Sequence, residues 1–184
     1  MTDRSARCRS LGPDDAPAFQ ALRLRGLLEC PSAFVASHAE EAATPLADVA
    51  KRLEPAAGRA VFGAFDDGVL VGVVGLVREH YRKLAHKGFV WGMYVAPEAR
   101  RQGTGAALLA HALTHAANAW RLRQVNIGAN AANDAALALY RRLGFERYGV
   151  ERDFLCVDGV FHDECQMAWR APDALASQPG RTPS

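Results

Sequence analysis

Apolar side chains near the start of the chain recur at helical spacing. Residues 12–31 predict a helix that Asp14 or Asp15 caps and that Pro31 ends. Its loosely helical apolar face is formed by Phe19, Leu22, Leu24, Leu27 and Leu28.

A second helix is predicted for residues 44–53. Thr44 stands at its N-cap and Pro45 at its first position, where the missing N–H of proline costs nothing. We expect residues 30–43 to form the loop between the two helices. Residues 6–11 are expected to form a short strand before the first helix.

The middle of the chain changes to runs of β-branched and aromatic residues. Residues 60–79 contain two such runs around an Asp-Asp-Gly sequence at 66–68, which predicts a β-hairpin. A polar, basic connection at residues 80–87 follows. Residues 88–95, GFVWGMYV, predict a further strand.

The second half alternates helices with strands. We expect a helix at about 103–119, a strand at 124–129, and a helix that Asn133 caps and Gly144 ends. Residues 151–169 predict a hairpin around an Asp-Gly turn. The first of these helices carries an apolar face of Leu109, Ala112, Leu113 and Ala116.

The order of these segments is β-α-α-β-β-β-α-β-α-β-β, which indicates a mixed α/β sheet. The length of 184 residues suits one domain, which we assign to residues 1–170. Residues 171–184 are rich in Pro, Ser and Ala and are expected to be a disordered tail.

Composition and charge narrow the class of protein. No apolar stretch approaches the ~20 residues that span a bilayer, and the N-terminus lacks the apolar core of a secretory signal. We therefore expect a cytoplasmic protein without a membrane partner. Residues 100–147 hold seven arginines against two acids, which favours an anionic ligand. This excess is too small and too free of lysine to predict a nucleic-acid groove.

The chain offers no recognisable metal site. Its cysteines match no zinc pattern, and His111 and His115 lack a third ligand, so we expect them to face solvent and to bind no metal. In the terminal hairpin, the expected register pairs Cys156 with Phe161 and Cys165 with Arg152. The two thiols are then not cross-strand partners. All four cysteines, Cys8, Cys30, Cys156 and Cys165, are expected to be free.

The arginines begin where the aromatic-rich strand is followed by a helix. Gly103 and Gly105 lack a Cβ, so the backbone can approach a ligand closely there. The first N–H groups of a helix are unpaired and carry partial positive charge, which suits a phosphate. Since Arg100 and Arg101 add charge, we predict a phosphate or pyrophosphate across residues 101–106.

Two common nucleotide motifs do not fit this turn. A Walker loop needs a lysine, and none lies between residues 88 and 184. A Rossmann turn needs a third glycine where Leu108 stands, and an acidic residue about 20 positions later at the end of a strand.

A longer pattern does fit. The spacing V-x-P-x-x-R-x-x-G-x-G is matched by Val95, Pro97, Arg100, Gly103 and Gly105. A second pattern, N-x-x-A-x-x-L-Y-x-x-x-G-F, is matched by Asn133, Ala136, Leu139, Tyr140, Gly144 and Phe145. With the order of elements, these residues resemble the GNAT N-acetyltransferase superfamily over roughly residues 7–170. The resemblance implies a mostly antiparallel sheet of about 6–7 strands with a splayed central pair, flanked by about four helices.

The resemblance also implies a site for acetyl-CoA. In that family the pantetheine arm lies beside the strand that precedes the glycine turn, which implies main-chain contacts from Met93, Tyr94 and Val95. Asn133 matches a position near the pantetheine or the adenosine, although a simple helix cap would look the same. The candidate residues around the pyrophosphate are Arg100, Arg101, Gln102, Gly103, Thr104, Gly105 and Ala106.

The implied reaction is direct transfer of an acetyl group to a neutral amine. A strand N–H near Met93 would hold the oxyanion. Tyr140 would protonate the departing thiolate, unless it is an ordinary helix tyrosine. The strand before the glycine turn carries no Glu or His that could act as the general base. Our candidate is Glu79, with His80, Glu151 and bulk water as alternatives.

The acceptor side is less defined by the sequence. Strand alternation puts Trp91 and Tyr94 on opposite faces, so only one of them can line the acceptor cleft. In the family, the loop between the first two helices borders the acceptor. Phe34, Glu40 and Glu41 are therefore candidates for recognising a cationic or amine-bearing substrate, unless this loop is simply solvated.

Three functions follow from these residues. We expect an N-acetyltransferase that acts on a small-molecule amine. Acetylation of a protein N-terminus or lysine is the second reading, and a non-catalytic acyl-CoA-binding module is the third. Tyr140 favours turnover, whereas the missing strand base favours the module. The terminal hairpin is a candidate homodimer surface.

Overall fold

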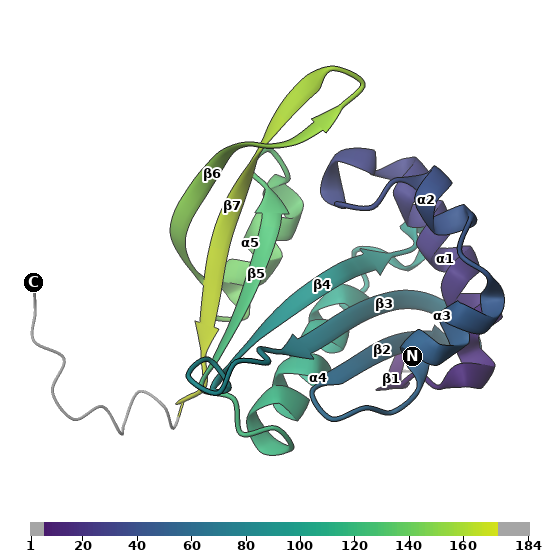
Figure 1. Cartoon of the computed structure of the whole chain (residues 1–184), viewed down its shortest axis with the longest axis horizontal. Coiled ribbons are helices and arrows are strands. Elements are labelled where there is room, and N and C mark those ends of the chain that lie inside the picture. The colour runs from purple at the N-terminus through teal and green to yellow at the C-terminus, as the bar shows by residue number, and fades with distance from the viewer. Residues whose placement is uncertain (1–5, 173–184) are drawn as a thin grey trace, which may run out of the picture.

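A computed structural model describes residues 6–172, which form one seven-stranded sheet with helices on both faces (Figure 1). The strands are β1 (Arg7–Ser10), β2 (Arg59–Asp66), β3 (Val69–Arg78), β4 (Lys87–Val95), β5 (Gln124–Asn130), β6 (Glu146–Val157) and β7 (Val160–Arg170). The α-helices are α1 (Ala16–Glu29), α2 (His38–Ala42), α3 (Leu46–Leu53), α4 (Thr104–Asn118) and α5 (Asp134–Arg142). Short 3-10 helices are η1 (Pro13–Asp15), η2 (Pro31–Ala33) and η3 (Pro97–Ala99).

The strand order is β1-β2-β3-β4-β5-β7-β6, and β4–β5 is the one parallel pair in this sheet of described strands. The predicted mixed, mostly antiparallel sheet is confirmed. No helix within residues 6–172 is long and apolar enough to cross a membrane. Of the predicted tail, residues 173–184 lie outside the described residues.

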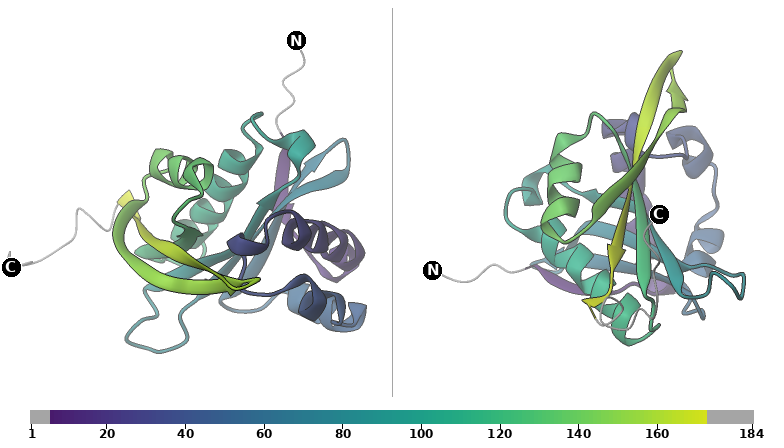
Figure 2. Two further views of the ribbon diagram at one scale, coloured as in Figure 1. Left: turned by 90° about the horizontal axis from the view of Figure 1, so that it is seen from above. Right: turned by 90° about the vertical axis from the view of Figure 1, so that its left-hand side faces the viewer.

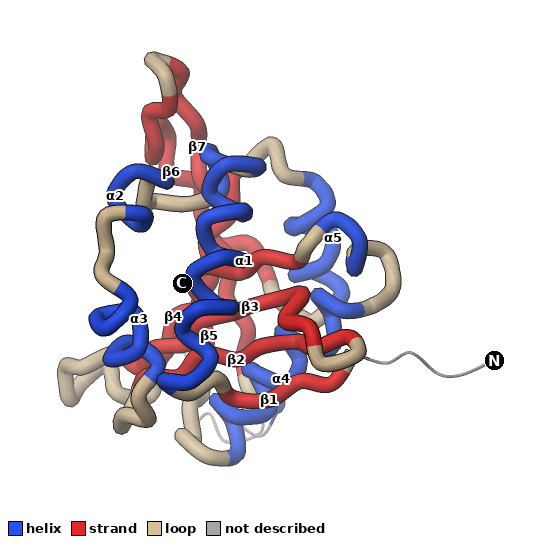
Figure 3. Tube along the Cα trace, turned by 90° about the vertical axis from the view of Figure 1, so that its right-hand side faces the viewer, coloured by secondary structure: helices blue, strands red, loops and turns tan. Residues whose placement is uncertain are grey.

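The helices cover the sheet in two layers. Helices α1 and α3 lie on one face, and α4 and α5 lie on the other (Figures 2 and 3). Alternation along β3 sends Val73 toward α1 and Val74 toward α4, so each face buries its own apolar core. The predicted apolar face of α4 is buried as expected, through Leu109, Ala112, Leu113 and Ala116.

Two helix predictions need correction. Helix α3 begins at Leu46, and its N-cap is Pro45 rather than Thr44, because the backbone of Pro45 is extended with φ −60° and ψ 142°. The predicted loop at 30–43 contains α2. Ser37 accepts a hydrogen bond from the Glu40 amide at 3.2 Å, and the Glu40 carboxylate accepts one from the Ser37 amide at 2.8 Å. This capping box is visible in the sequence as S-x-x-E.

Strand β4 contains a bulge at Gly92, whose φ is +62°. Opposite it, the register with β3 shifts, so that Trp91 pairs with Gly75 and Tyr94 with Val73. The extra residue turns Trp91 and Tyr94 to the same face, where both pack with the α1 core. The prediction that they occupy opposite faces is therefore wrong.

Strands β4 and β5 pair over a short distance. Their register runs from Lys87 opposite Gln124 to Val90 opposite Ile127 and then stops, although both strands continue. The bulge at Gly92 follows this last pair directly and directs β4 away from β5 (Figure 1). The predicted splayed pair in the centre of the sheet is confirmed.

The terminal hairpin has a shifted register. Cys156 pairs with Phe161 as predicted, but Cys165 pairs with Val150 rather than Arg152. The reason is an irregularity between Glu151 and Leu155. The cysteines at positions 8, 30, 156 and 165 are free thiols, as expected.

The His111–His115 pair does not face solvent as predicted. Both rings meet the edge of Phe62, with centroid separations of 5.2 and 5.1 Å, and both are half-buried. Burial first, and then the neighbouring His111, lower the pKa of His115. No group of three or more metal-ligating side chains gathers within residues 6–172.

The backbone conformation of Gly103 predicts how substitutions at this position change stability. This residue caps α4 with φ +84°, and no atom lies within 4 Å of the position that a Cβ would occupy. We expect Gly103→Ala to lower the free energy of unfolding by about 1 kcal/mol through backbone strain alone. Gly103→Asn should lose less, because Asn tolerates this conformation. Urea unfolding measures the difference.

The matched control is Gly12→Ala. Gly12 also has open space around its Cβ position, but its φ is −124°. Equal losses at both positions would show that the left-handed backbone at residue 103 is not what requires glycine.

Candidate active site

The start of α4 presents free backbone amides. Gly103 has no side chain to cap the helix, and the first intrahelical bond to its carbonyl comes from the Ala107 amide at 3.0 Å. The N–H groups of Thr104, Gly105 and Ala106 therefore precede the first closed turn and carry its positive partial charge. At Gly105 an added Cβ would meet only ordinary contacts, at 3.4 Å or more.

Arg100 has a structural role at this turn. Its Nε donates to the Val95 carbonyl at 2.8 Å, and its Nη1 lies 2.6 Å from Glu29 Oε1. Its guanidinium also lies 5.5 Å from the ring centroid of Tyr94. These contacts join the turn to β4 and to the end of α1. Arg101 is exposed.

Some of the other residues predicted to contact the cofactor make contacts within the protein instead, and one lines the cavity. Gln102 Nε2 donates to the Glu98 carbonyl at 2.9 Å. Tyr94 is buried under α1, and its hydroxyl donates to Glu29 at 2.6 Å. Burial and the Glu29 carboxylate raise the pKa of Tyr94 to about 12. Of the three predicted strand contacts, Met93 lines the cavity between β4 and β5, whereas Tyr94 and Val95 do not.

A cavity of about 730 Å³ opens where β4 and β5 separate. Its walls come from α1, β4, β5, α5, the η2–α2 segment and the terminal hairpin. The residues that line it include Arg23, Phe34, Trp91, Met93, Tyr140 and Glu164. This cavity is continuous with the strand gap in which the resemblance predicts the pantetheine arm.

Tyr140 and Asn133 come to this cavity from α5. Tyr140 is 6% exposed, and burial raises the pKa of its phenol to about 12. The phenol therefore stays protonated and able to donate a hydrogen bond. Asn133 Oδ1 accepts from the Ala136 amide at 3.1 Å, which confirms the predicted helix cap, and Asn133 also lines the cavity.

Two carboxylates of the terminal hairpin lie side by side at the cavity, a pairing that the sequence analysis did not predict. Glu151 of β6 and Glu164 of β7 are direct cross-strand partners, and both line the cavity. Burial first, and then the charge of Glu151, raise the pKa of Glu164. The carboxyl of Glu164 lies over Gly128, where a Cβ would overlap it. In the register of β5 and β7, Gly128 pairs with Gln166 and Glu164 pairs with Asn130, so the sequence carried no direct signal for this contact.

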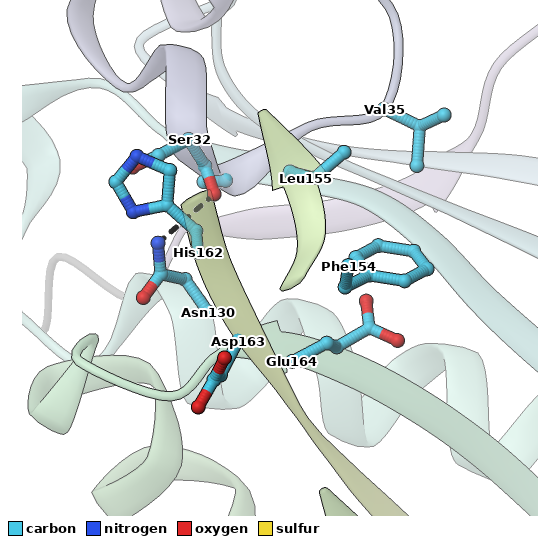
Figure 4. Close-up of a pocket in the computed structure, with 9 residues that line it drawn as sticks. Ser32, Val35, Asn130, Phe154, Leu155, His162, Asp163 and Glu164 are labelled. Carbon is cyan, nitrogen blue, oxygen red and sulfur yellow. Dashed lines mark hydrogen bonds between the residues drawn. The ribbon is translucent and has the colours of Figure 1, made fainter. Parts of the chain in front are cut away.

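A second, smaller pocket lies beside this cavity and shares Ala33, Val35, Asn130, Phe154 and Glu164 with it (Figure 4). Asn130 Nδ2, at the end of β5, donates to the Ser32 carbonyl of η2 at 3.2 Å. Phe154 and Glu164 lie on the same side of this contact, and the hairpin thus meets the segment that precedes α2.

The remaining candidates lie elsewhere. Glu79 follows the end of β3, where its amide donates to the Lys87 carbonyl at 3.0 Å, and it does not line the cavity. Glu41 is 5% exposed and is held by Arg23 and Arg52 rather than free for a substrate. Glu40 lines the cavity, but its carboxylate caps α2.

An opened sheet, a helix with free N-terminal amides and a cavity with a buried phenol together have the arrangement expected of a CoA-dependent acyltransferase. The chain belongs to the acetyltransferase (GNAT) family, whose sequence model matches residues 25–145. This confirms the family and the class of enzyme that the sequence predicted. Enzymes of this family use acetyl-CoA and act on amine acceptors. No curated protein matches the chain.

Solved structures share the fold. A ribosomal-protein-alanine N-acetyltransferase from Brucella melitensis is similar with a TM-score of 0.79 and 24% identity, over 90% of this chain and 99% of that one. A GNAT-family acetyltransferase from Streptococcus pneumoniae has a TM-score of 0.74 and 20% identity, over 91% and 100%. The ribosomal-protein-S18-alanine N-acetyltransferase from Escherichia coli has a TM-score of 0.66 and 20% identity, over 90% and 94%.

The free amides of α4 allow a prediction about CoA binding. Residue 106 occupies the third helical position, from which a glutamate reaches back to the N-cap amide. Ala106→Glu should therefore keep or raise the melting temperature but weaken CoA binding about tenfold, because its charge repels the pyrophosphate. Calorimetry with CoA measures the loss, which should shrink at high salt.

Ala106→Gln has the same size without the charge and should bind CoA much more tightly than Ala106→Glu. Equal affinities for the two variants would mean that no phosphate lies at these amides.

Proposed function

We propose that the protein transfers an acetyl group from acetyl-CoA directly to a primary amine of a small molecule. The observation that carries this proposal is the continuity of the site. The free amides at the start of α4 lie next to Met93, since a Cβ on Gly105 would come within 3.5 Å of that side chain, and Met93 lines the same cavity as Tyr140 and Glu164. The diphosphate would bind at the amides, and the pantetheine arm would lie along Met93 in the gap.

Glu164 is the general base in this proposal. It lines the cavity, whereas Glu79 does not. Its paired carboxylate, Glu151, gives that wall a negative charge that attracts a cationic ammonium group. Its raised pKa brings it nearer to the range in which a base accepts a proton effectively. The bound ammonium first releases one proton to water, and the neutral amine then loses a second proton to Glu164 as its nitrogen bonds to the acetyl carbon.

Tyr140 acts at the leaving sulfur. As the carbon–sulfur bond breaks, the electron pair goes to sulfur, and the phenol of Tyr140 donates a hydrogen bond to the developing thiolate. A phenol with a pKa of about 12 is a weaker acid than a thiol, whose pKa is about 8.5. Tyr140 therefore stabilises the thiolate while largely keeping its own proton.

The size of the cavity supports a small acceptor. Its volume of about 730 Å³ lies in the range of pockets that hold a small molecule. The alternative is a protein N-terminus that enters end-on, and it draws support from two fold relatives named as ribosomal-protein-alanine acetyltransferases. A non-catalytic module would bind CoA but release no thiol with any amine.

The first test replaces the proposed base. Glu164→Gln should lower kcat/KM by about 10²- to 10⁴-fold, because the amine then loses its proton acceptor. Thiol release from acetyl-CoA with a panel of small amines measures it. Glu79→Gln is the matched control and should keep wild-type activity. If kcat/KM fell in Glu79→Gln but not in Glu164→Gln, Glu79 would be the general base instead.

The pH profile gives a second test. Glu164 works as a base only when deprotonated, so kcat/KM should rise as the pH increases through its pKa. Glu151→Gln removes the neighbouring negative charge and so lowers that pKa. The rise in kcat/KM should then move to lower pH.

The control for this shift is Glu146→Gln, which removes a charge from the same strand but pairs with Ala168, away from Glu164. An unchanged profile in Glu151→Gln would contradict the role of Glu164.

A further inference from the structure

Arg23 is a buried cation whose charge the described residues only partly satisfy. It projects from α1, is 8% exposed and lines the cavity. Its guanidinium carbon lies 5.0 Å from the ring centroid of Phe34 and 6.0 Å from that of Trp91. Its Nη1 lies beside Gly92, at the bulge of β4, where a Cβ would come within 3.2 Å. Two aromatic side chains and the bulge therefore hold the guanidinium at the cavity wall.

The hydrogen bonds of Arg23 are incomplete. Neither its Nε nor its Nη1 has a hydrogen-bond partner among the described residues. Glu41 Oε2 lies 3.6 Å from Nε, which is an ion pair but is too long for a hydrogen bond. Glu41 Oε1 contacts Arg52 Nη2 at 2.5 Å instead. One carboxylate thus serves two guanidinium groups, and the three side chains, of which Arg23 and Glu41 are buried and Arg52 is partly exposed, keep a net charge of +1.

Such an arrangement is costly unless a ligand completes it. A buried donor without a partner loses its hydration without compensation, and a buried cation loses more. The planar guanidinium matches the two oxygens of a carboxylate, which can accept two parallel hydrogen bonds. Arg52, the other member of the pair with Glu41, does not line this cavity.

The cavity has charges of opposite sign on two walls. Arg23 provides positive charge from α1, and Glu151 and Glu164 provide negative charge from the terminal hairpin. A simple alkylamine would satisfy the hairpin wall but leave Nε and Nη1 of Arg23 without a hydrogen-bond partner. A molecule with both an ammonium and a carboxylate group satisfies both walls.

We propose that the acceptor is a small amino carboxylate, an amino acid or a close derivative, whose carboxylate binds Arg23 while its amine faces Glu164. This inference rests on the acetyltransferase function proposed above and adds the class of acceptor. Arg23 is then a specificity residue, since it contacts the substrate away from the reacting atoms.

The test compares each acceptor with its uncharged analogue. Wild-type protein is given acetyl-CoA with a panel of free amino acids and the corresponding amino acid amides, and thiol release gives kcat/KM. The free acids should exceed the amides by roughly 10- to 100-fold, the contribution of hydrogen bonds to a charged partner. This comparison does not depend on any variant folding.

Variants assign the preference to Arg23. Arg23→Gln should abolish the preference for the free acid, mainly through KM. Arg23→Lys should restore part of it, because it keeps the charge without the planar fork. Arg25→Gln is the matched control: it removes an arginine from the same helix that pairs with Glu98 on the surface, and it should keep the wild-type preference.

The outcomes separate the two proposals. Equal rates for acids and amides, turnover of carboxyl-free amines only, or a preference that survives in folded Arg23→Gln would overturn the assignment of Arg23 and leave the acetyltransferase function in place. CoA binding without thiol release from any member of the panel would overturn both proposals.

Discussion

The site depends on the point at which β4 and β5 stop pairing. A parallel pair would normally continue along both strands, but here it ends after Val90 and Ile127. The bulge at Gly92 follows at once and turns the rest of β4 toward α1. Because this happens in the centre of the sheet, the opening has a wall on either side and a helix N-terminus at one end. The cavity follows from that one interruption.

A second set of contacts holds the glycine turn against this opening. Glu29, at the end of α1, accepts the hydroxyl of Tyr94 and pairs with Arg100. Burial is the largest cause of the raised pKa of Tyr94. The hydrogen bond from Tyr94 is the largest cause of the lowered pKa of Glu29. Gly26 lets α1 approach the Tyr94 ring closely, since an added Cβ would lie 3.0 Å from it. Arg100, part of the motif that pointed to the ligand, thus orients the turn from behind.

Local signals made the fold and the turn predictable from sequence. Turn residues, caps and apolar periodicity gave the order of strands and helices, and the Val95–Gly105 spacing gave the family. What failed were features set by tertiary geometry. The bulge at Gly92 reversed the alternation expected for Trp91 and Tyr94, and an irregular stretch of β6 shifted the partner of Cys165. The pairing of Glu151 with Glu164 needed that same register, so sequence reasoning named Glu151 alone. Glu41 was a candidate for substrate recognition because its two partners, Arg23 and Arg52, lie on other helices, and the sequence alone does not show these ion pairs.

The brief contact between β4 and β5 has a consequence for stability. Four residue pairs are the backbone link between strands β1–β4 and strands β5–β7. A pantetheine arm carries amide groups of its own, so in the opening it can act as a surrogate strand that bridges both sheet edges. Any ligand that binds only the folded chain shifts the folding equilibrium by mass action. The cosubstrate would then be a component of the sheet as well as a reactant, and the resting enzyme would be weakest along the seam where its chemistry occurs.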